Sequence, residues 1–174
     1  MSVKGRALRY LAQREHSRLE LEQKLARRVQ DTPEASAAAQ IAKALDELSA
    51  HGLISAERVA ESVLTSRAPR YGVHRLRQTL QAKGLDATLV ADTLATARST
   101  ELERARALWQ RRYGKPGANA AERARQMRFL AGRGFDSAVI RAVVQGRGEP
   151  EDEADGAADN LADDAADDAA DRAA

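Results

Sequence analysis

The 174-residue chain contains no cysteine and no long apolar run. Without cysteine, disulfide bonds, thiolate zinc sites and cysteine nucleophiles are excluded. The first residues, MSVKGRALRYLAQREHSR, lack the continuous apolar segment of a secretory signal or a membrane span. We therefore expect a cytoplasmic protein with no membrane partner.

Catalytic signatures are also missing. There is no Walker phosphate-binding loop, no dinucleotide-binding glycine fingerprint and no His-Glu-x-x-His zinc motif. The histidines His16, His51 and His74 are scattered singly, which is typical of surface or helix-end positions. The carboxylates of Glu101 and Glu103 fall on a helical pattern whose apolar face predicts them to be solvated. The sequence predicts no catalytic residue, no metal ligand and no cofactor, so we do not expect an enzyme.

Charge is divided unevenly along the chain. Residues 1–148 hold 27 Lys and Arg against 15 Asp and Glu, a net charge of +12, whereas residues 149–174 hold 1 against 11, a net charge of −10. The second segment alternates acidic residues with alanine, and Leu161 is its only large apolar side chain. Such a composition cannot bury enough surface to offset the entropy cost of ordering, which predicts a disordered acidic tail.

The positive charge of residues 1–148 favours a polyanionic partner, such as DNA, RNA or an acidic protein. Arginine outnumbers lysine 22 to 5 in this part of the chain, and a guanidinium forms bidentate contacts with phosphate or carboxylate groups. Two simpler interpretations remain open. One is that the basic surface is inert. The other is that the arginine bias reflects genome composition.

Helical periodicity dominates residues 1–148, and no stretch shows the two-residue alternation of a β-strand. Apolar residues recur in helical segments that fall into groups of three, which predicts an all-α fold of three tandem three-helix repeats. The predicted limits are 1–54, 55–98 and 99–148, followed by the disordered tail at 149–174. Because a repeat of about forty-five residues holds little core alone, neighbouring repeats should pack together in an elongated, curved body. We expect a monomer.

Local signals place several helix ends. Ser17-Arg18-Leu19-Glu20 has the form of a capping box, and Thr32-Pro33 is typical of a helix start. Segment 80–86 resembles segment 130–136, fifty residues later, and Gly52 marks a variant of the same pattern. In each pattern a glycine in the left-handed conformation would end one helix, and in the two similar segments an aspartate would cap the next. These segments therefore predict helix-to-helix corners.

Basic residues mixed with an aromatic ring are the best binding candidates. Tyr71 can stack on a base or on a guanidinium, and it lies among arginines between two predicted helices. A solvated, salt-bridged face is the better explanation of any single arginine, but the cluster as a whole favours binding. The candidate residues for contact with a protein partner or DNA are Arg67, Arg70, Tyr71, Arg75, Arg77, Lys83, Arg123, Arg125, Arg128 and Arg133.

A series of short motifs runs through residues 1–148. They are Ala7-Leu8-Arg9-Tyr10-Leu11-Ala12, Arg14-Glu15-His16-Ser17-Arg18 with Leu21, Gly52-Leu53-Ile54, Arg67 with Tyr71-Gly72, Lys83-Gly84, Phe129-Leu130 and Arg133-Gly134-Phe135. None of them is diagnostic alone. In this order and at this spacing, they resemble the RecX family of bacterial recombination regulators. The acidic tail departs from the pattern of that family.

The resemblance implies three three-helix repeats in a curved molecule. It also implies binding to the RecA recombinase filament on DNA, in the filament groove, with restraint of RecA's ATPase, strand-exchange and coprotease activities in DNA repair, recombination and the SOS response. We expect the DNA to be single-stranded and also double-stranded. The alternative is an autonomous helical DNA-binding or repressor-like protein, since three-helix units with a glycine-bearing turn also form helix-turn-helix modules. Against it, no recognition helix rich in arginine or asparagine is evident.

The acidic tail is either a solubilising extension or a competitor for the basic surface. A disordered tail tethered to a basic body is present at high effective concentration, so it can occupy phosphate-binding arginines. Truncation before Glu149 is then expected to tighten binding to bare single-stranded DNA, most clearly at low salt, because ionic screening weakens the masking. Fluorescence anisotropy across a salt series measures the effect. Equal affinities of the full-length and truncated chains at every salt concentration would leave the tail with no masking role.

Overall fold

The computed structural model describes residues 1–146. Within that range the chain forms nine α-helices and no β-strand, which confirms the predicted all-α class. None of the described helices is both long and apolar enough to cross a membrane. The predicted acidic tail at 149–174 lies outside the described residues. The helices are α1 (Val3–Leu11), α2 (Arg18–Ala26), α3 (Ala37–Ala50), α4 (Ala56–Arg67), α5 (Val73–Ala82), α6 (Ala87–Ser99), α7 (Glu101–Arg112), α8 (Ala120–Gly132) and α9 (Ser137–Gln145).

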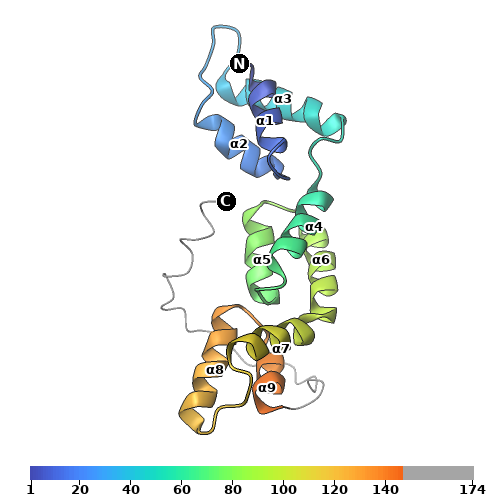
Figure 1. Ribbon diagram of the computed structural model, residues 1–174. Coiled ribbons are helices and arrows are strands. Elements are labelled where there is room, and N and C mark those ends of the chain that lie inside the picture. Colours follow the sequence, from blue (N-terminus) through green and yellow to red (C-terminus); the bar gives the residue numbers. More distant parts are fainter. Residues whose placement is uncertain (147–174) are drawn as a thin grey trace.

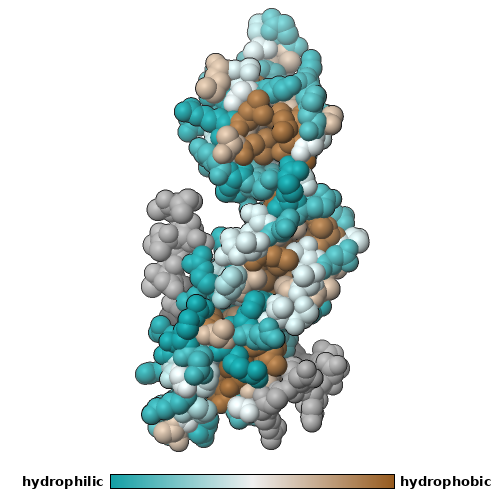
Figure 2. Space-filling model, turned by 45° about the vertical axis from the view of Figure 1, so that its right-hand side comes forward, coloured by the Kyte–Doolittle hydropathy of each residue, from teal (hydrophilic) through white to brown (hydrophobic). Residues whose placement is uncertain are grey.

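The helices pack in three successive groups of three, which we call the first, second and third triplets (Figure 1). Each triplet encloses its own apolar cluster, which contains Leu45 in the first, Leu76 in the second and Leu130 in the third. The triplets follow one another along an elongated, gently curved body (Figure 1). Figure 2 shows apolar surface in separate areas along one face, the widest of them on the first triplet. The predicted repeat limits at 1–54, 55–98 and 99–148 stay predictions.

Left-handed glycines end helices at the predicted corners. Gly52, Gly84 and Gly134 have φ angles of 67°, 69° and 75°. Asp86 and Asp136 then accept hydrogen bonds from backbone amides in the first turns of α6 and α9. These positive φ angles confirm the corner prediction. Glycine occupies the positions because this backbone conformation strains any residue that carries a Cβ atom.

Helix starts agree with the sequence at one predicted site and differ at another. The capping box is confirmed, since Ser17 Oγ accepts from the Glu20 amide and the Glu20 carboxylate accepts from the Ser17 amide. The predicted start at Thr32-Pro33 is wrong, because α3 begins after a different N-cap, Ser36. Thr32 instead closes a short turn with Ala35 through reciprocal hydrogen bonds. Threonine and serine are both favoured as N-caps, so local preference did not distinguish the two positions.

His16 directly precedes the N-cap of α2, so it lies at a helix end as predicted, but it is buried and not at the surface. Its Nδ1 lies 3.0 Å from the Arg14 carbonyl oxygen and its Nε2 lies 2.9 Å from Lys24 Nζ. Because an ammonium can only donate, the neutral ring carries its proton on Nδ1 and donates it to Arg14. Burial lowers the pKa of His16 and outweighs the opposing effect of the backbone hydrogen bond. His51 and His74 are exposed, as predicted.

The second and third triplets are joined by direct contact between their backbones. The Gly72 amide donates to the carbonyl of Arg133, and the His74 amide donates to the carbonyl of Gly134, at 2.9 and 3.0 Å. A Cβ atom at position 72 would overlap the Gly134 carbonyl oxygen, and a Cβ atom at position 134 would lie 2.6 Å from the Arg75 nitrogen. Only glycine permits this approach at either position.

Glu101 stabilises the same junction from inside. Its Oε1 accepts hydrogen bonds from the amides of Val73 and Asp136, at 2.9 and 3.2 Å, and so satisfies the starts of α5 and α9 together. The residue is only 3% exposed, so the prediction that it is solvated is wrong. Burial raises the pKa of Glu101, and the two amide hydrogen bonds and the nearby Arg104 only partly oppose that shift.

Arg104 anchors the loop between α4 and α5 on α7. Its guanidinium donates to the carbonyls of Ala68 and Tyr71 in that loop and to the carbonyl of Ala97 near the end of α6. Burial lowers the pKa of Arg104, and the charge of Glu101 opposes this effect. Glu101 and Arg104 therefore form hydrogen bonds with backbone groups of both triplets. The bond from Arg104 to the Tyr71 carbonyl fixes the position of Tyr71.

The first and second triplets meet through polar side chains instead. Lys83 Nζ lies 2.8 Å from Glu20 Oε1, and Arg14 lies 3.0 Å from the same oxygen. Arg58 of α4 pairs with Glu15 at 2.8 Å. Burial by itself would raise the pKa of Glu20, but hydrogen bonds, chiefly from Arg14 and Lys83, outweigh burial and lower it to about 2. We call this arrangement the polar joint.

Replacement of Glu101 tests the junction between the second and third triplets. In Glu101→Ala two buried amides lose their acceptor, so we expect the free energy of unfolding to fall by about 2 to 4 kcal/mol. Glu101→Gln keeps one accepting oxygen but loses the charge and replaces the other oxygen by an NH2 group, so its cost should be about 1 kcal/mol. Urea unfolding followed by circular dichroism compares the two variants. Equal losses would show that the charge, and not the hydrogen bonds to Val73 and Asp136, stabilises the junction.

Candidate nucleic-acid interface

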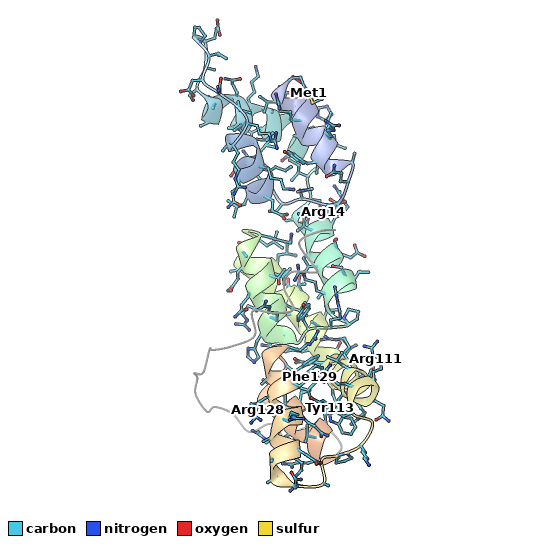
Figure 3. The ribbon with its side chains drawn as sticks, turned by 60° about the vertical axis from the view of Figure 1, so that its left-hand side comes forward. Met1, Arg14, Arg111, Tyr113, Arg128 and Phe129 are labelled. Carbon is cyan, nitrogen blue, oxygen red and sulfur yellow. The ribbon has the colours of Figure 1, made fainter. Side chains whose placement is uncertain are left out.

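Arginine and aromatic side chains alternate across the second and third triplets. In the third triplet the rings of Tyr113 and Phe129 meet edge to face, with 5.6 Å between their centres. The guanidinium carbon of Arg112 lies 5.0 Å from the centre of the Phe129 ring, and that of Arg133 lies 5.3 Å from it. Figure 3 shows Phe129 and Tyr113 close together on this triplet, from α8 and from the end of α7.

Tyr71 continues the series into the second triplet. Arg133 lies 5.8 Å from the centre of the Tyr71 ring, and Arg67 and Arg70 each lie 6.0 Å from it. The residues in contact therefore form one chain of neighbours from α7 to α4. We call them the arginine–aromatic row: Arg67, Arg70, Tyr71, Arg112, Tyr113, Phe129 and Arg133.

The junction between the triplets brings the two halves of the row together. Tyr71 directly precedes Gly72, whose amide donates to the Arg133 carbonyl, and this backbone contact brings the Tyr71 ring and the Arg133 side chain close together. Phe129 and Arg133 are four residues apart at the end of α8 and therefore share one helix face. The row thus depends on the close backbone contact between residues far apart in the sequence.

Stacking against the rings restrains the arginines before any partner binds. A guanidinium within about 6 Å of an aromatic centre is attracted by roughly 0.5 to 1 kcal/mol at an exposed site. Arg70 and Arg112 are exposed, while Arg67 and Arg133 are half-buried. Restraint lowers the entropy cost of binding, and the fork of N–H donors on each guanidinium suits phosphate oxygens. Such a row can bind a nucleic-acid backbone without reading its bases.

The structure distributes the ten predicted binding residues over several places. Four of them, Arg67, Arg70, Tyr71 and Arg133, come together in the row. Lys83 lies in the polar joint. The other five are exposed on two helices. Arg75 and Arg77 lie on α5, and Arg123, Arg125 and Arg128 lie on α8.

Arg123 and Arg128 both lie on α8 but differ in their surroundings. Arg123 donates to the Gly117 carbonyl, so its side chain also supports the loop before α8. Arg128 projects from α8 on the side of the third triplet away from α7 (Figure 3). The ten residues therefore do not form one patch: the row brings four of them together, and the polar joint contains only Lys83.

Three members of the row were missing from the predicted binding residues. They are Arg112, Tyr113 and Phe129, and Phe129 was recognised only as part of a family motif. The neighbouring pair Arg112-Tyr113 carries the same arginine and tyrosine combination as Arg70-Tyr71, which was the available signal. Periodicity alone could not reveal the contact between the two triplets, because it spans about sixty residues.

Known proteins similar to this chain agree on one family. A family model described as the third three-helix domain of RecX matches residues 99–144, which contain α7, α8 and all but the last residue of α9. Regulatory protein RecX of Leptothrix cholodnii is 52% identical over 145 residues, covering 83% of this chain and 88% of the relative. Regulatory protein RecX of Ralstonia nicotianae is 43% identical over 146 residues, covering 84% and 88%.

This chain belongs to the RecX family. The crystal structure of RecX from Lactobacillus salivarius is similar in fold, with a TM-score of 0.66 and 23% sequence identity over 83% of this chain and 93% of that one. Membership of the RecX family, whose relatives are named as regulatory proteins, indicates a regulatory role. The predicted family and the predicted helical repeat fold are both confirmed.

Removal of one ring tests whether the row orders its arginines. Phe129→Leu leaves the net charge unchanged but removes the ring between Arg112 and Arg133, so we expect affinity for single-stranded DNA to fall about three- to tenfold. Phe135→Leu is the matched control, because this ring is buried in the same triplet outside the row. The control should lower thermal stability and leave affinity unchanged. Equal affinities of the two variants in fluorescence anisotropy would contradict an ordering role for the ring.

Proposed function

We propose that this protein binds the RecA filament on DNA and restrains RecA's ATPase, strand-exchange and coprotease activities. The observation that carries the proposal is the arginine–aromatic row, which lies across two joined triplets of an elongated body in a member of the RecX family. An elongated body can contact more than one protomer of a helical filament. The row would meanwhile bind phosphate groups of the enclosed DNA.

The proposed mechanism involves binding only. A molecule that spans neighbouring protomers would favour one spacing of the filament over others, and a ligand shifts an equilibrium by its difference in affinity for the two states. In this mechanism, ATP hydrolysis and strand exchange both proceed through a change of filament state. A bound bridge would therefore slow both processes without chemistry of its own.

A titration of RecA's ATP hydrolysis tests this function. On single-stranded DNA, we expect hydrolysis to fall at amounts of this protein well below one molecule per RecA protomer, because each bridge restrains several protomers. The interface variant Arg70→Glu, Arg112→Glu, Arg133→Glu reverses the charge of three arginines of the row and should inhibit less. The matched control Arg9→Glu, Arg27→Glu, Arg28→Glu changes the charge equally at exposed positions of the first triplet and should inhibit nearly as well as the unchanged chain.

A comparison of binding to bare DNA and to RecA filaments separates this function from its alternative. An autonomous DNA-binding protein would bind bare DNA as tightly as it binds RecA filaments at physiological salt. Unchanged ATP hydrolysis at equimolar protein would contradict the proposed function. Loss of helix content in the interface variant would instead identify its three arginines as structural residues.

A further inference from the structure

A pocket of about 280 Å³ lies between the first and second triplets, beside the polar joint. The loop between α1 and α2 contributes one wall, and Figure 3 shows Arg14 of this loop at the boundary of the two triplets. Helix α4 and the segment after it form most of the opposite wall. Its charged and hydroxyl-bearing lining includes Arg14, Glu15, Ser62, Arg67, Arg70 and Lys83.

The pocket has a strongly positive lining. Four cationic side chains line it against a single carboxylate, that of Glu15, which pairs with Arg58 at 2.8 Å. Glu20 lies just outside the pocket walls and shares one oxygen between Arg14 and Lys83, so a single negative charge faces two positive ones. Positive charge concentrated in a concave surface attracts anions more strongly than the same charge on a flat one.

We propose that this pocket binds a phosphate group, carried either by a small phosphate compound or by a nucleic-acid backbone. A phosphate offers several oxygens in a tetrahedral arrangement, so it can accept from guanidinium, ammonium and hydroxyl donors that approach from different walls. Ser62 supplies a hydroxyl, while the arginines and Lys83 supply charge. The proposal concerns the isolated protein and holds whether or not the protein acts on RecA.

The position of the pocket gives such a ligand a second consequence. Arg14 belongs to the first triplet and the other three cations belong to the second, so a phosphate held among them bridges the polar joint. The joint is otherwise maintained by the ion pairs of Glu15 and Glu20 and by Leu19 against Gly84. A bound phosphate therefore also fixes the angle between the first and second triplets.

Substitution of Ser62 tests the site in the full-length protein. Ser62 is exposed on α4, so Ser62→Glu places a carboxylate in the pocket without disturbing the core. Ser62→Gln is the neutral control of similar size. Thr65→Glu is the charge control on the same helix, at an exposed position outside the pocket. Inorganic pyrophosphate and a short oligothymidylate are the probes, followed by amide and arginine side-chain shifts in nitrogen-15 NMR.

We expect pyrophosphate to shift signals of Arg14, Lys83 and residues 62–70. Ser62→Glu should weaken this binding at least about tenfold, and Ser62→Gln, which loses the hydroxyl but adds no charge, should weaken it by much less. Thr65→Glu, outside the pocket, should leave it within about twofold. If Ser62→Glu weakens oligothymidylate binding as well, the backbone is the source of the phosphate. If only pyrophosphate binding falls, the ligand is a small phosphate compound. Equal effects of Ser62→Glu and Thr65→Glu, or shifts spread over all arginines, would overturn the proposal.

Discussion

Backbone hydrogen bonds join the second and third triplets where Gly72 approaches Gly134, and the arrangement of these two triplets depends on this contact. Gly72 and Gly134 leave no room for a side chain between them. The carboxylate of Glu101 then accepts hydrogen bonds from amides at the starts of α5 and α9. The guanidinium of Arg104 donates hydrogen bonds to carbonyls of the neighbouring loop. A buried charge is tolerated here because its hydrogen bonds are satisfied by backbone groups that would otherwise lack partners.

The two joints of the body differ in chemistry, and this difference has mechanical consequences. The junction between the second and third triplets uses buried backbone hydrogen bonds, which are insensitive to salt. The polar joint uses the ion pairs Lys83–Glu20 and Arg58–Glu15, whose strength falls as salt screens them. The second and third triplets therefore form the more rigid unit. The first triplet is attached to it by contacts that a change in ionic conditions or a bound anion can alter.

Function follows from the same division. The rigid unit holds the arginine–aromatic row, where Tyr71 meets Arg133 beside the hydrogen bond from the Gly72 amide to the Arg133 carbonyl. Preorganised arginines suit a repetitive polyanion, because every phosphate offers the same group and no base needs to be read. The pocket lies at the adjustable end of that unit, where Arg67 and Arg70 border both features. Binding along the row and geometry at the polar joint are thus physically connected.

The sequence by itself determined the features that depend on a few neighbouring residues: the all-α class, the capping box at Ser17, the left-handed corners at Gly84 and Gly134, and the motifs typical of the RecX family. Competing N-caps explain why the start of α3 was misplaced. Only the tertiary structure decided which polar groups are buried and which arginines meet. Three features arise between segments that are distant in sequence. They are the burial of His16 and Glu101, the connection of Arg112 and Phe129 to Tyr71 through Arg133, and the pocket beside Lys83. Helical periodicity and capping preferences act over a few residues, so they carry no information about such contacts.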